Sequence, residues 1–174
     1  MTRTIRRLAA VMTLGATLVL AGCGLQQSDS SVPNGGLPGI SGPATPISAV
    51  TLSGTPFAWS STHGHVVVLD FWGSWCGPCN AEQPQLNQIA AQWMPKGVVF
   101  LGVDVNDTTP NGAAFERTYN VPYPSVSDAS EVIESEYNVP APPTVVIVDA
   151  QGNIVDHFLG TVTGLSADLS RLTA

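Results

Sequence analysis

A nearly continuous apolar run leads directly to two cysteines that are separated by two residues. The run is Val66-Val67-Val68-Leu69-Asp70-Phe71-Trp72, and Cys76-Gly77-Pro78-Cys79 follows it. A helical pattern begins at the same point, so the thiols are predicted to lie where a strand ends and a helix begins. A helix N-terminus presents unpaired N–H groups and a partial positive charge, which stabilise a thiolate at the first cysteine. The spacing also permits a small disulfide ring, so the sequence predicts a reactive dithiol.

Two other interpretations of this cysteine pair are half of a zinc site and a purely structural disulfide. Zinc would need two more ligands at short spacing, and the only other cysteine, Cys23, lies far upstream. The histidines, His63, His65 and His157, are too dispersed for a ligand set and are expected at the surface or in loops. No metal site is therefore predicted.

Strand-like and helix-like segments alternate from residue 47 onward. Strands are expected over residues 47–52, 65–72, 98–105, 144–149 and 153–159. Helices are expected from residue 76, over 111–119 after an N-cap at Thr109, and over 131–137 and 166–172. Ala150-Gln151-Gly152 is a hairpin signal between the last two strands. This order predicts a three-layer α/β sandwich with a mixed sheet over residues 46–174.

The N-terminus has the three parts of a signal peptide. Arg3, Arg6 and Arg7 precede an apolar stretch, residues 8–21, that is too short for a comfortable transmembrane helix. Leu20-Ala21-Gly22-Cys23 resembles the bacterial lipobox, in which the cysteine is lipidated and becomes the first mature residue. We therefore expect a signal peptide over 1–22 and a lipid on Cys23. An ordinary signal peptide or an uncleaved anchor are the alternatives, and each places the domain outside the cytoplasm.

The segment after Cys23 is predicted to be a flexible linker over residues 23–45. Between positions 24 and 45 it has five Gly, three Pro and four Ser with no hydrophobic period. A chain of that length reaches roughly 25 Å, enough for a small domain to reorient above a membrane.

The charge balance excludes some partners. Without residues 1–22 the chain keeps three basic residues against 13 acidic ones. A chain with this excess of negative charge is poorly suited to bind nucleic acid or anionic lipid, so membrane attachment would depend on Cys23. The length supports one globular domain, which we expect to be a monomer.

Several spaced motifs resemble the thioredoxin superfamily. Asp70, six residues before Cys76, matches the carboxylate that the family buries beneath its disulfide, and Pro143 before Thr144 matches its cis-proline. Residues 79–84 and 98–128 resemble the membrane-tethered, extracytoplasmic TlpA/ResA-like branch, which includes cytochrome c maturation thioredoxins. The resemblance covers about residues 47–172 and implies a thioredoxin-like fold.

The position of each candidate residue suggests its role. Cys76, at the helix start, is expected to be the exposed attacking thiolate, and Cys79 the shielded resolving thiol. Asp70, if buried, would have a raised pKa and relay a proton to or from Cys79. By resemblance, Glu82 matches an acid near the dithiol; the alternative for Glu82 is a solvated helix face.

A second set of residues is expected to contact the substrate protein. Pro78 stiffens the disulfide ring, and Gly77 leaves the sulfur open to a protein substrate. The preceding carbonyl at a cis Pro142-Pro143 bond would be free to pair with a bound chain. Trp75 flanks the attacking sulfur. No cofactor is expected besides the redox-active Cys76–Cys79 disulfide.

Together these features predict a lipid-anchored, extracytoplasmic thiol-disulfide oxidoreductase. We expect it to reduce protein disulfides, with apocytochrome c as a plausible client, and to be recharged by a membrane electron donor. Gly77-Pro78 matches the dipeptide of reducing thioredoxins and favours reduction modestly. The alternatives are an oxidant that introduces disulfides into exported proteins and, from another class, a copper-delivery module on the same fold. Copper modules usually separate their cysteines by three residues, which argues against the latter.

Overall fold

The computed structural model describes residues 41–174, so the predicted signal peptide, Cys23 and most of the predicted linker lie outside the described residues. Six strands form one sheet in the order β1-β6-β5-β2-β3-β4. Their bounds are β1 Gly42–Pro43, β2 Val67–Trp72, β3 Val99–Val105, β4 Ser125–Asp128, β5 Thr144–Val148 and β6 Asn153–Leu159. Strands β2, β3 and β4 are parallel, whereas β5 is antiparallel to β2, β6 to β5 and β1 to β6.

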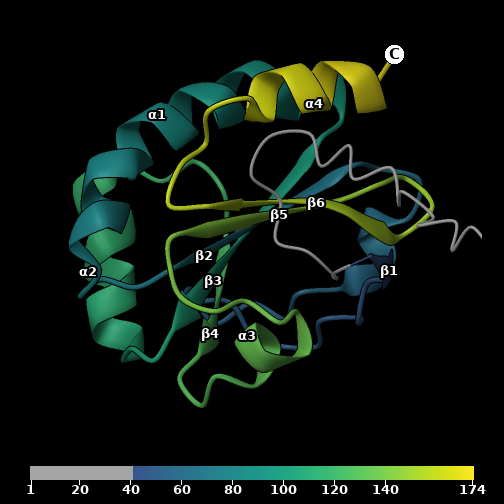
Figure 1. The fold of residues 1–174 in the computed structure, drawn as a ribbon. Coiled ribbons are helices and arrows are strands. Elements are labelled where there is room, and N and C mark those ends of the chain that lie inside the picture. Colours follow the sequence, from purple (N-terminus) through teal and green to yellow (C-terminus); the bar gives the residue numbers. More distant parts are fainter. Residues whose placement is uncertain (1–40) are drawn as a thin grey trace, which may run out of the picture. The chain divides into compact units, whose positions relative to one another are not determined.

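Helices cover both faces of this sheet (Figure 1). Their bounds are α1 Gly77–Trp93, α2 Thr109–Tyr119, α3 Val132–Glu136 and α4 Leu165–Leu172, with short 3₁₀ turns η1 Trp59–Thr62 and η2 Met94–Lys96. Helices α1, α2 and α4 lie on one face, and α3 lies on the other (Figure 1). The predicted three-layer α/β sandwich with a mixed sheet is therefore confirmed.

Strand β2 is buried at every position because it lies in the middle of the sheet with helices on both sides. Its side chains alternate between the two faces. Val68 packs with Leu86 and Leu165 in the core under α1 and α4. Leu69 packs with Tyr137 in the core on the opposite face. This central strand ends at Trp72, and the rigid position of its end fixes where the dithiol begins.

The N-terminal part of the fold differs from the sequence prediction. Gly42–Pro43, within the predicted linker, pairs with Ile154 and Asn153 of β6 at the sheet edge. The strand expected over 47–52 is not formed, and only isolated bridges occur at Val50 and Thr51. The chain reverses there through Gly54, whose φ of +86° favours glycine.

Two further expectations are corrected. Strand β4 was not predicted, because a four-residue segment with two serines carries little strand signal. The chain crosses through α2 after β3 and returns as β4, which pairs in parallel with β3 at the edge of the sheet. His157, expected at the surface, is only 2% exposed within β6. Burial lowers the pKa of His157 and a hydrogen bond to the backbone of Tyr137 opposes this, which favours the neutral ring. His63 and His65 are exposed, as predicted.

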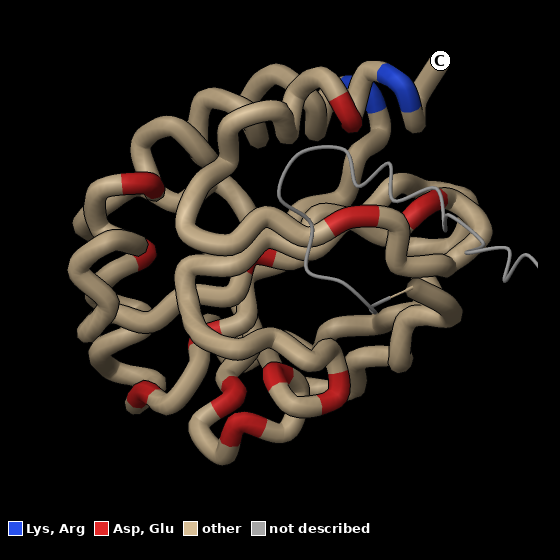
Figure 2. The backbone as a smooth tube through the Cα atoms, in the orientation of Figure 1, with Lys and Arg blue, Asp and Glu red and all other residues tan. Residues whose placement is uncertain are grey.

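Acidic residues are spread over many elements, whereas the visible basic segments lie near the C-terminal end (Figure 2). Arg171 pairs with Asp168 within α4. Across residues 41–174, no helix combines the length and apolar character needed to cross a membrane.

Candidate active site

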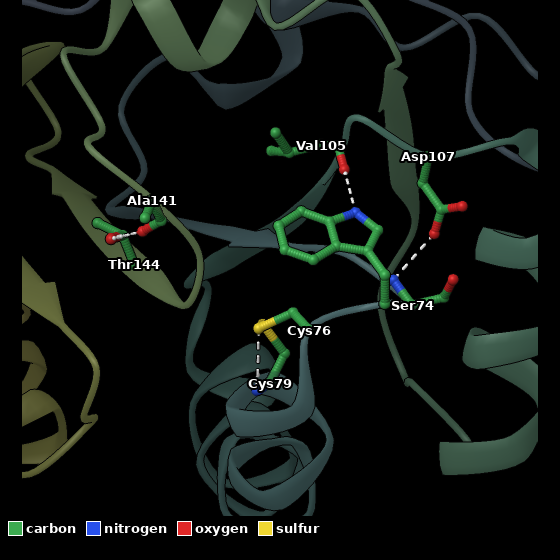
Figure 3. The surroundings of a disulfide bond; sticks show 8 residues. Ser74, Cys76, Cys79, Val105, Asp107, Ala141 and Thr144 are labelled. Carbon is green, nitrogen blue, oxygen red and sulfur yellow. Dashed lines mark hydrogen bonds between the residues drawn. A yellow bond between two sulfur atoms is a disulfide. The ribbon is translucent and has the colours of Figure 1, made fainter.

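Cys76 and Cys79 form a disulfide at the N-terminus of α1, with their Cα atoms 5.3 Å apart. Cys76 is the N-cap residue, and its Sγ accepts a hydrogen bond from the Cys79 backbone N–H at 3.2 Å (Figure 3). The backbone of Cys76 also donates to the Gly73 carbonyl. The first sulfur therefore lies in the positive field of the helix start, where a thiolate is stabilised.

Exposure does not distinguish the two cysteines in this disulfide form. Each is 3% exposed, so the expectation that Cys76 is exposed is wrong for the oxidised protein. The cause is a small apolar cluster in which both sulfurs pack with Trp72 and Phe115, whose rings stack at 4.2 Å. The neighbours on the surface are accessible: Trp75 is 56% exposed, and Gly77 and Pro78 are exposed as well.

The loop before the dithiol is held by the last residue of β3 and by the loop that follows this strand (Figure 3). The Ser74 backbone N–H donates to Asp107 Oδ2 at 2.9 Å, and the Trp75 indole N–H donates to the Val105 carbonyl at 3.0 Å. Burial by itself raises the pKa of Asp107, but hydrogen bonds from Ser74, Thr108 and Asn111 more than offset this and lower the pKa. Asp107 therefore remains a carboxylate that fixes the approach to Cys76.

The inner side of the dithiol faces a small pocket that contains both predicted acids. Asp70, Cys79, Glu82 and Pro143 line it together with three other side chains, Trp72, Gln83 and Leu86. Cys76 is not part of this lining. The structure thus brings Cys79, rather than Cys76, next to the carboxyl groups, as their predicted roles require.

Burial gives Asp70 the raised pKa expected from its position. Asp70 is 3% exposed, and desolvation raises its pKa to about 7; a hydrogen bond from Tyr123 opposes this rise and the nearby charge of Glu82 adds to it. Glu82 is partly buried, and burial raises its pKa to about 6. Both groups can therefore exchange protons near neutral pH, and Glu82 is not on a fully solvated helix face.

The proline loop completes the wall of the pocket. The Pro142–Pro143 peptide is cis, as predicted, and Pro143 is buried beside Cys79 whereas Pro142 is partly exposed. The Thr144 hydroxyl donates to the Ala141 carbonyl at 2.7 Å and closes the turn (Figure 3). Ala141 itself is exposed next to the dithiol face.

Sequence reasoning missed the polar partner of Asp70, Tyr123, and the residue that donates to Tyr123 in turn, Gln83. The Tyr123 hydroxyl donates to Asp70 Oδ2 at 2.9 Å, and Gln83 Nε2 donates to the Tyr123 hydroxyl at 2.8 Å. A signal for Gln83 was present, because it lies four residues after Cys79 on the buried stripe of α1 and a buried amide needs a partner. Tyr123 lies 53 residues from Asp70, and no local pattern links them.

No group of three or more His, Cys, Asp or Glu side chains within residues 41–174 could hold a metal ion. Cys23 is outside the described residues, so its predicted lipidation stays a prediction.

Comparisons with known proteins agree with this geometry. Residues 27–173 match the family model described as Redoxin. Soluble secreted antigen MPT53 of Mycobacterium tuberculosis is 40% identical over 104 residues, 60% of this chain and 59% of that protein. Thiol-disulfide oxidoreductase ResA of Bacillus anthracis is 31% identical over 112 residues, 64% of this chain and 65% of that protein. The match thus spans less than two thirds of either relative.

A solved structure covers more of its own chain. A secreted disulfide oxidoreductase of Mycobacterium tuberculosis, described as homologous to DsbE of E. coli, superposes with a TM-score of 0.66 at 34% identity. It covers 73% of this chain and 96% of that one. With the mixed sheet, the dithiol at the start of α1 and the family match over most of its length, this chain belongs to the Redoxin family and is a ResA-like member of the thioredoxin superfamily.

Proposed function

We propose that this protein is a membrane-tethered, extracytoplasmic thiol-disulfide oxidoreductase that reduces disulfides in other proteins through Cys76 and Cys79. The observation that carries the proposal is the arrangement of the pair: Cys76 caps α1, while Cys79 faces the pocket that holds Asp70 and Glu82. An attacking thiolate and a resolving thiol with a nearby base are what thiol-disulfide exchange needs. The names of ResA and of the secreted mycobacterial oxidoreductase support the same class of reaction.

The reaction follows from this geometry in two exchanges. The Cys76 thiolate attacks one sulfur of a client disulfide, that bond breaks, and the first client thiolate leaves and takes up a proton. Cys79 then gives its proton to the Asp70 carboxylate, and the Cys79 thiolate attacks Cys76 Sγ. The mixed disulfide breaks, the second client thiolate leaves, and the Cys76–Cys79 disulfide forms. Two electrons pass to the client, and a membrane electron donor restores the dithiol.

The groups around the dithiol support a protein as the substrate. Trp75 offers an exposed aromatic surface close in sequence to the exposed Gly77 and Pro78, and the Ala141–Pro143 loop reaches the dithiol through Pro143, which lines a pocket with Cys79. An extended client chain could pair with the backbone at the exposed Ala141 and the partly exposed Pro142 while its disulfide meets Cys76. Apocytochrome c, whose haem motif is itself a Cys-x-x-Cys pair, is the first client class to test.

A trapping experiment tests both class and client. In the full chain with Cys79→Ser, expressed in its native envelope, clients should remain linked to Cys76, because no resolving thiol releases them. The Cys76→Ser, Cys79→Ser variant is the matched control. Clients with Cys-x-x-Cys-His motifs would support maturation of cytochromes, and diverse secreted multi-cysteine clients would indicate oxidative folding instead. If no protein is captured above the control, exchange through Cys76 is contradicted.

The proposed membrane tether predicts a separate result for Cys23→Ala. The change should move the protein from the membrane to the soluble fraction, because a lipid on Cys23 would be the attachment. Disulfide reduction by the released protein should be unchanged, since Cys76 and Cys79 pair with each other. Fractionation followed by a reduction assay measures both. A Cys23→Ala protein that still sediments with membranes would contradict lipid anchoring.

A further inference from the structure

The carboxyl group of Asp70 is held by a chain of hydrogen bonds that starts on α1. Asn87 Nδ2 donates to the Tyr119 carbonyl at 2.7 Å, and Gln83 Nε2 donates to Asn87 Oδ1 at 2.9 Å. Gln83 Nε2 also donates to the Tyr123 hydroxyl, which donates to Asp70 Oδ2. Gln83 is 2% exposed and Tyr123 and Asp70 are each 3% exposed, so this part of the chain is shielded from water.

The direction of these bonds fixes the hydroxyl proton of Tyr123. A tyrosine hydroxyl has one proton to donate, and Gln83 already occupies a lone pair of its oxygen. The Tyr123 hydroxyl proton therefore points to Asp70 Oδ2, and this oxygen acts as the hydrogen-bond acceptor. The side-chain hydrogen bond of Asp70 is thus made at Oδ2, and Asp70 lines the same pocket as Cys79.

We propose that Tyr123 is a positioning residue for disulfide exchange: by holding Asp70 Oδ2, it leaves Oδ1 as the oxygen that exchanges a proton with Cys79. This inference rests on the proposed function and adds a residue to it. When the Cys79 S–H proton moves to Oδ1, the Asp70 carboxylate becomes a carboxylic acid and the Cys79 thiolate becomes the nucleophile. Oδ2 keeps its bond to Tyr123 in both states, so no rearrangement is needed.

The surroundings of Tyr123 suit a permanent donor. Its ring packs against Phe100 with centroids 5.6 Å apart, which holds the hydroxyl in place. Burial and the negative charge of Asp70 raise the pKa of Tyr123 well above its usual value, so the hydroxyl keeps its proton over the working pH range. Among the residues that line the pocket with Asp70, the charged side chain is that of Glu82, which lies on α1.

Tyr123→Phe tests the proposal because it removes one hydroxyl and keeps the ring that packs on Phe100. Without that donor the Asp70 carboxylate loses a stabilising bond, so we expect its titration midpoint to rise by about one pH unit. NMR of the Asp70 side-chain carboxyl in the full-length oxidised protein measures this shift, since neither disulfide cysteine titrates there. Release of a mixed disulfide at pH 7 should slow severalfold and recover at higher pH.

Three further variants make the result specific. Tyr119→Phe, whose hydroxyl takes no part in this chain of bonds, should shift nothing. Gln83→Met should produce a smaller shift in the same direction, because Tyr123 loses the bond that orients it. In an Asp70→Asn background, Tyr123→Phe should leave the pH profile of release unchanged.

The outcomes separate the two proposals. An unchanged Asp70 midpoint in Tyr123→Phe, in a protein that still exchanges disulfides, would overturn the positioning role alone. If the unaltered protein exchanges no disulfide at all, the proposed function fails, whatever the titration shows. A Tyr123→Phe release rate that is lowered equally at every pH would also overturn the positioning role, because it would indicate a general loss of packing.

Discussion

Replacing Cys76 with Ala should reduce disulfide exchange to the rate seen without the protein, whereas Cys79→Ala should still attack clients and accumulate as a mixed disulfide. Cys76 caps α1 and its sulfur accepts the Cys79 N–H, so its thiolate is the stabilised one. Cys79 lines the inner pocket, where it can resolve the intermediate. Reduction of a disulfide-bonded model protein measures turnover, and nonreducing gels measure the trapped complex.

A Cys23→Ala background removes the third cysteine as a competing thiol, and the Cys76→Ala, Cys79→Ala variant gives the baseline. In the reduced wild-type protein, Cys76 should react with an alkylating reagent faster than Cys79 at neutral pH. Faster alkylation of Cys79, or a stable mixed disulfide formed by the Cys76→Ala protein, would reverse the two assignments.

Asp70→Asn should stabilise the oxidised protein at high pH and slow release of mixed disulfides most at high pH. Burial raises the pKa of Asp70 from 3.8 to about 7, so the folded state holds its proton more tightly than the unfolded chain does. Stability is therefore lost as pH rises from about 4 to about 7, where the folded carboxyl ionises. Three pH units correspond to roughly 4 kcal/mol, and Asn removes this loss.

Denaturant unfolding of both oxidised proteins at pH 4 and pH 8 measures the effect. The two should differ little at pH 4, and Asp70→Asn should be the more stable at pH 8. Asp104, whose pKa burial and Asp107 raise to about 8, gives the same trend in both proteins and cancels in the difference. Glu82→Gln, at a less buried carboxyl, should give a smaller gain. Equal stability at both pH values, with unchanged exchange rates, would show that Asp70 is an ordinary strand residue.

The sequence predicted the parts of this site that depend on neighbours along the chain. The end of β2, the start of α1 and the two cysteines lie within a few residues, so apolar pattern and spacing were sufficient. The burial of Asp70 and the cis Pro142–Pro143 bond were also expected, because motifs resembling a known family carry them.

The rest depends on contacts between distant segments. Tyr123 meets Asp70 and Asp107 meets Ser74 only after the sheet has assembled, since β2, β3 and β4 are neighbours in space. The environment of His157 likewise depends on a distant segment, because its ring forms a hydrogen bond with the backbone of Tyr137. Gly42–Pro43 carries no strand propensity, and only an edge position beside β6 makes a glycine-proline strand possible.

The prediction that Cys76 is exposed was wrong for a related reason. Its position at a helix start predicted its electrostatics correctly, but burial depends on what packs over it. Trp72 and Phe115, from β2 and α2, enclose the disulfide in an apolar cluster. Opening of this cluster in the reduced protein would be needed for a client to reach the sulfur.

The most direct test of the account follows one turnover in time. The reduced full-length protein is mixed with a disulfide-bonded client, quenched with acid at intervals, and mapped by mass spectrometry. We predict a transient client adduct on Cys76, followed by the Cys76–Cys79 disulfide and an equal amount of fully reduced client. A client that stays oxidised while both cysteines stay reduced, or an adduct that forms first on Cys79, would contradict it.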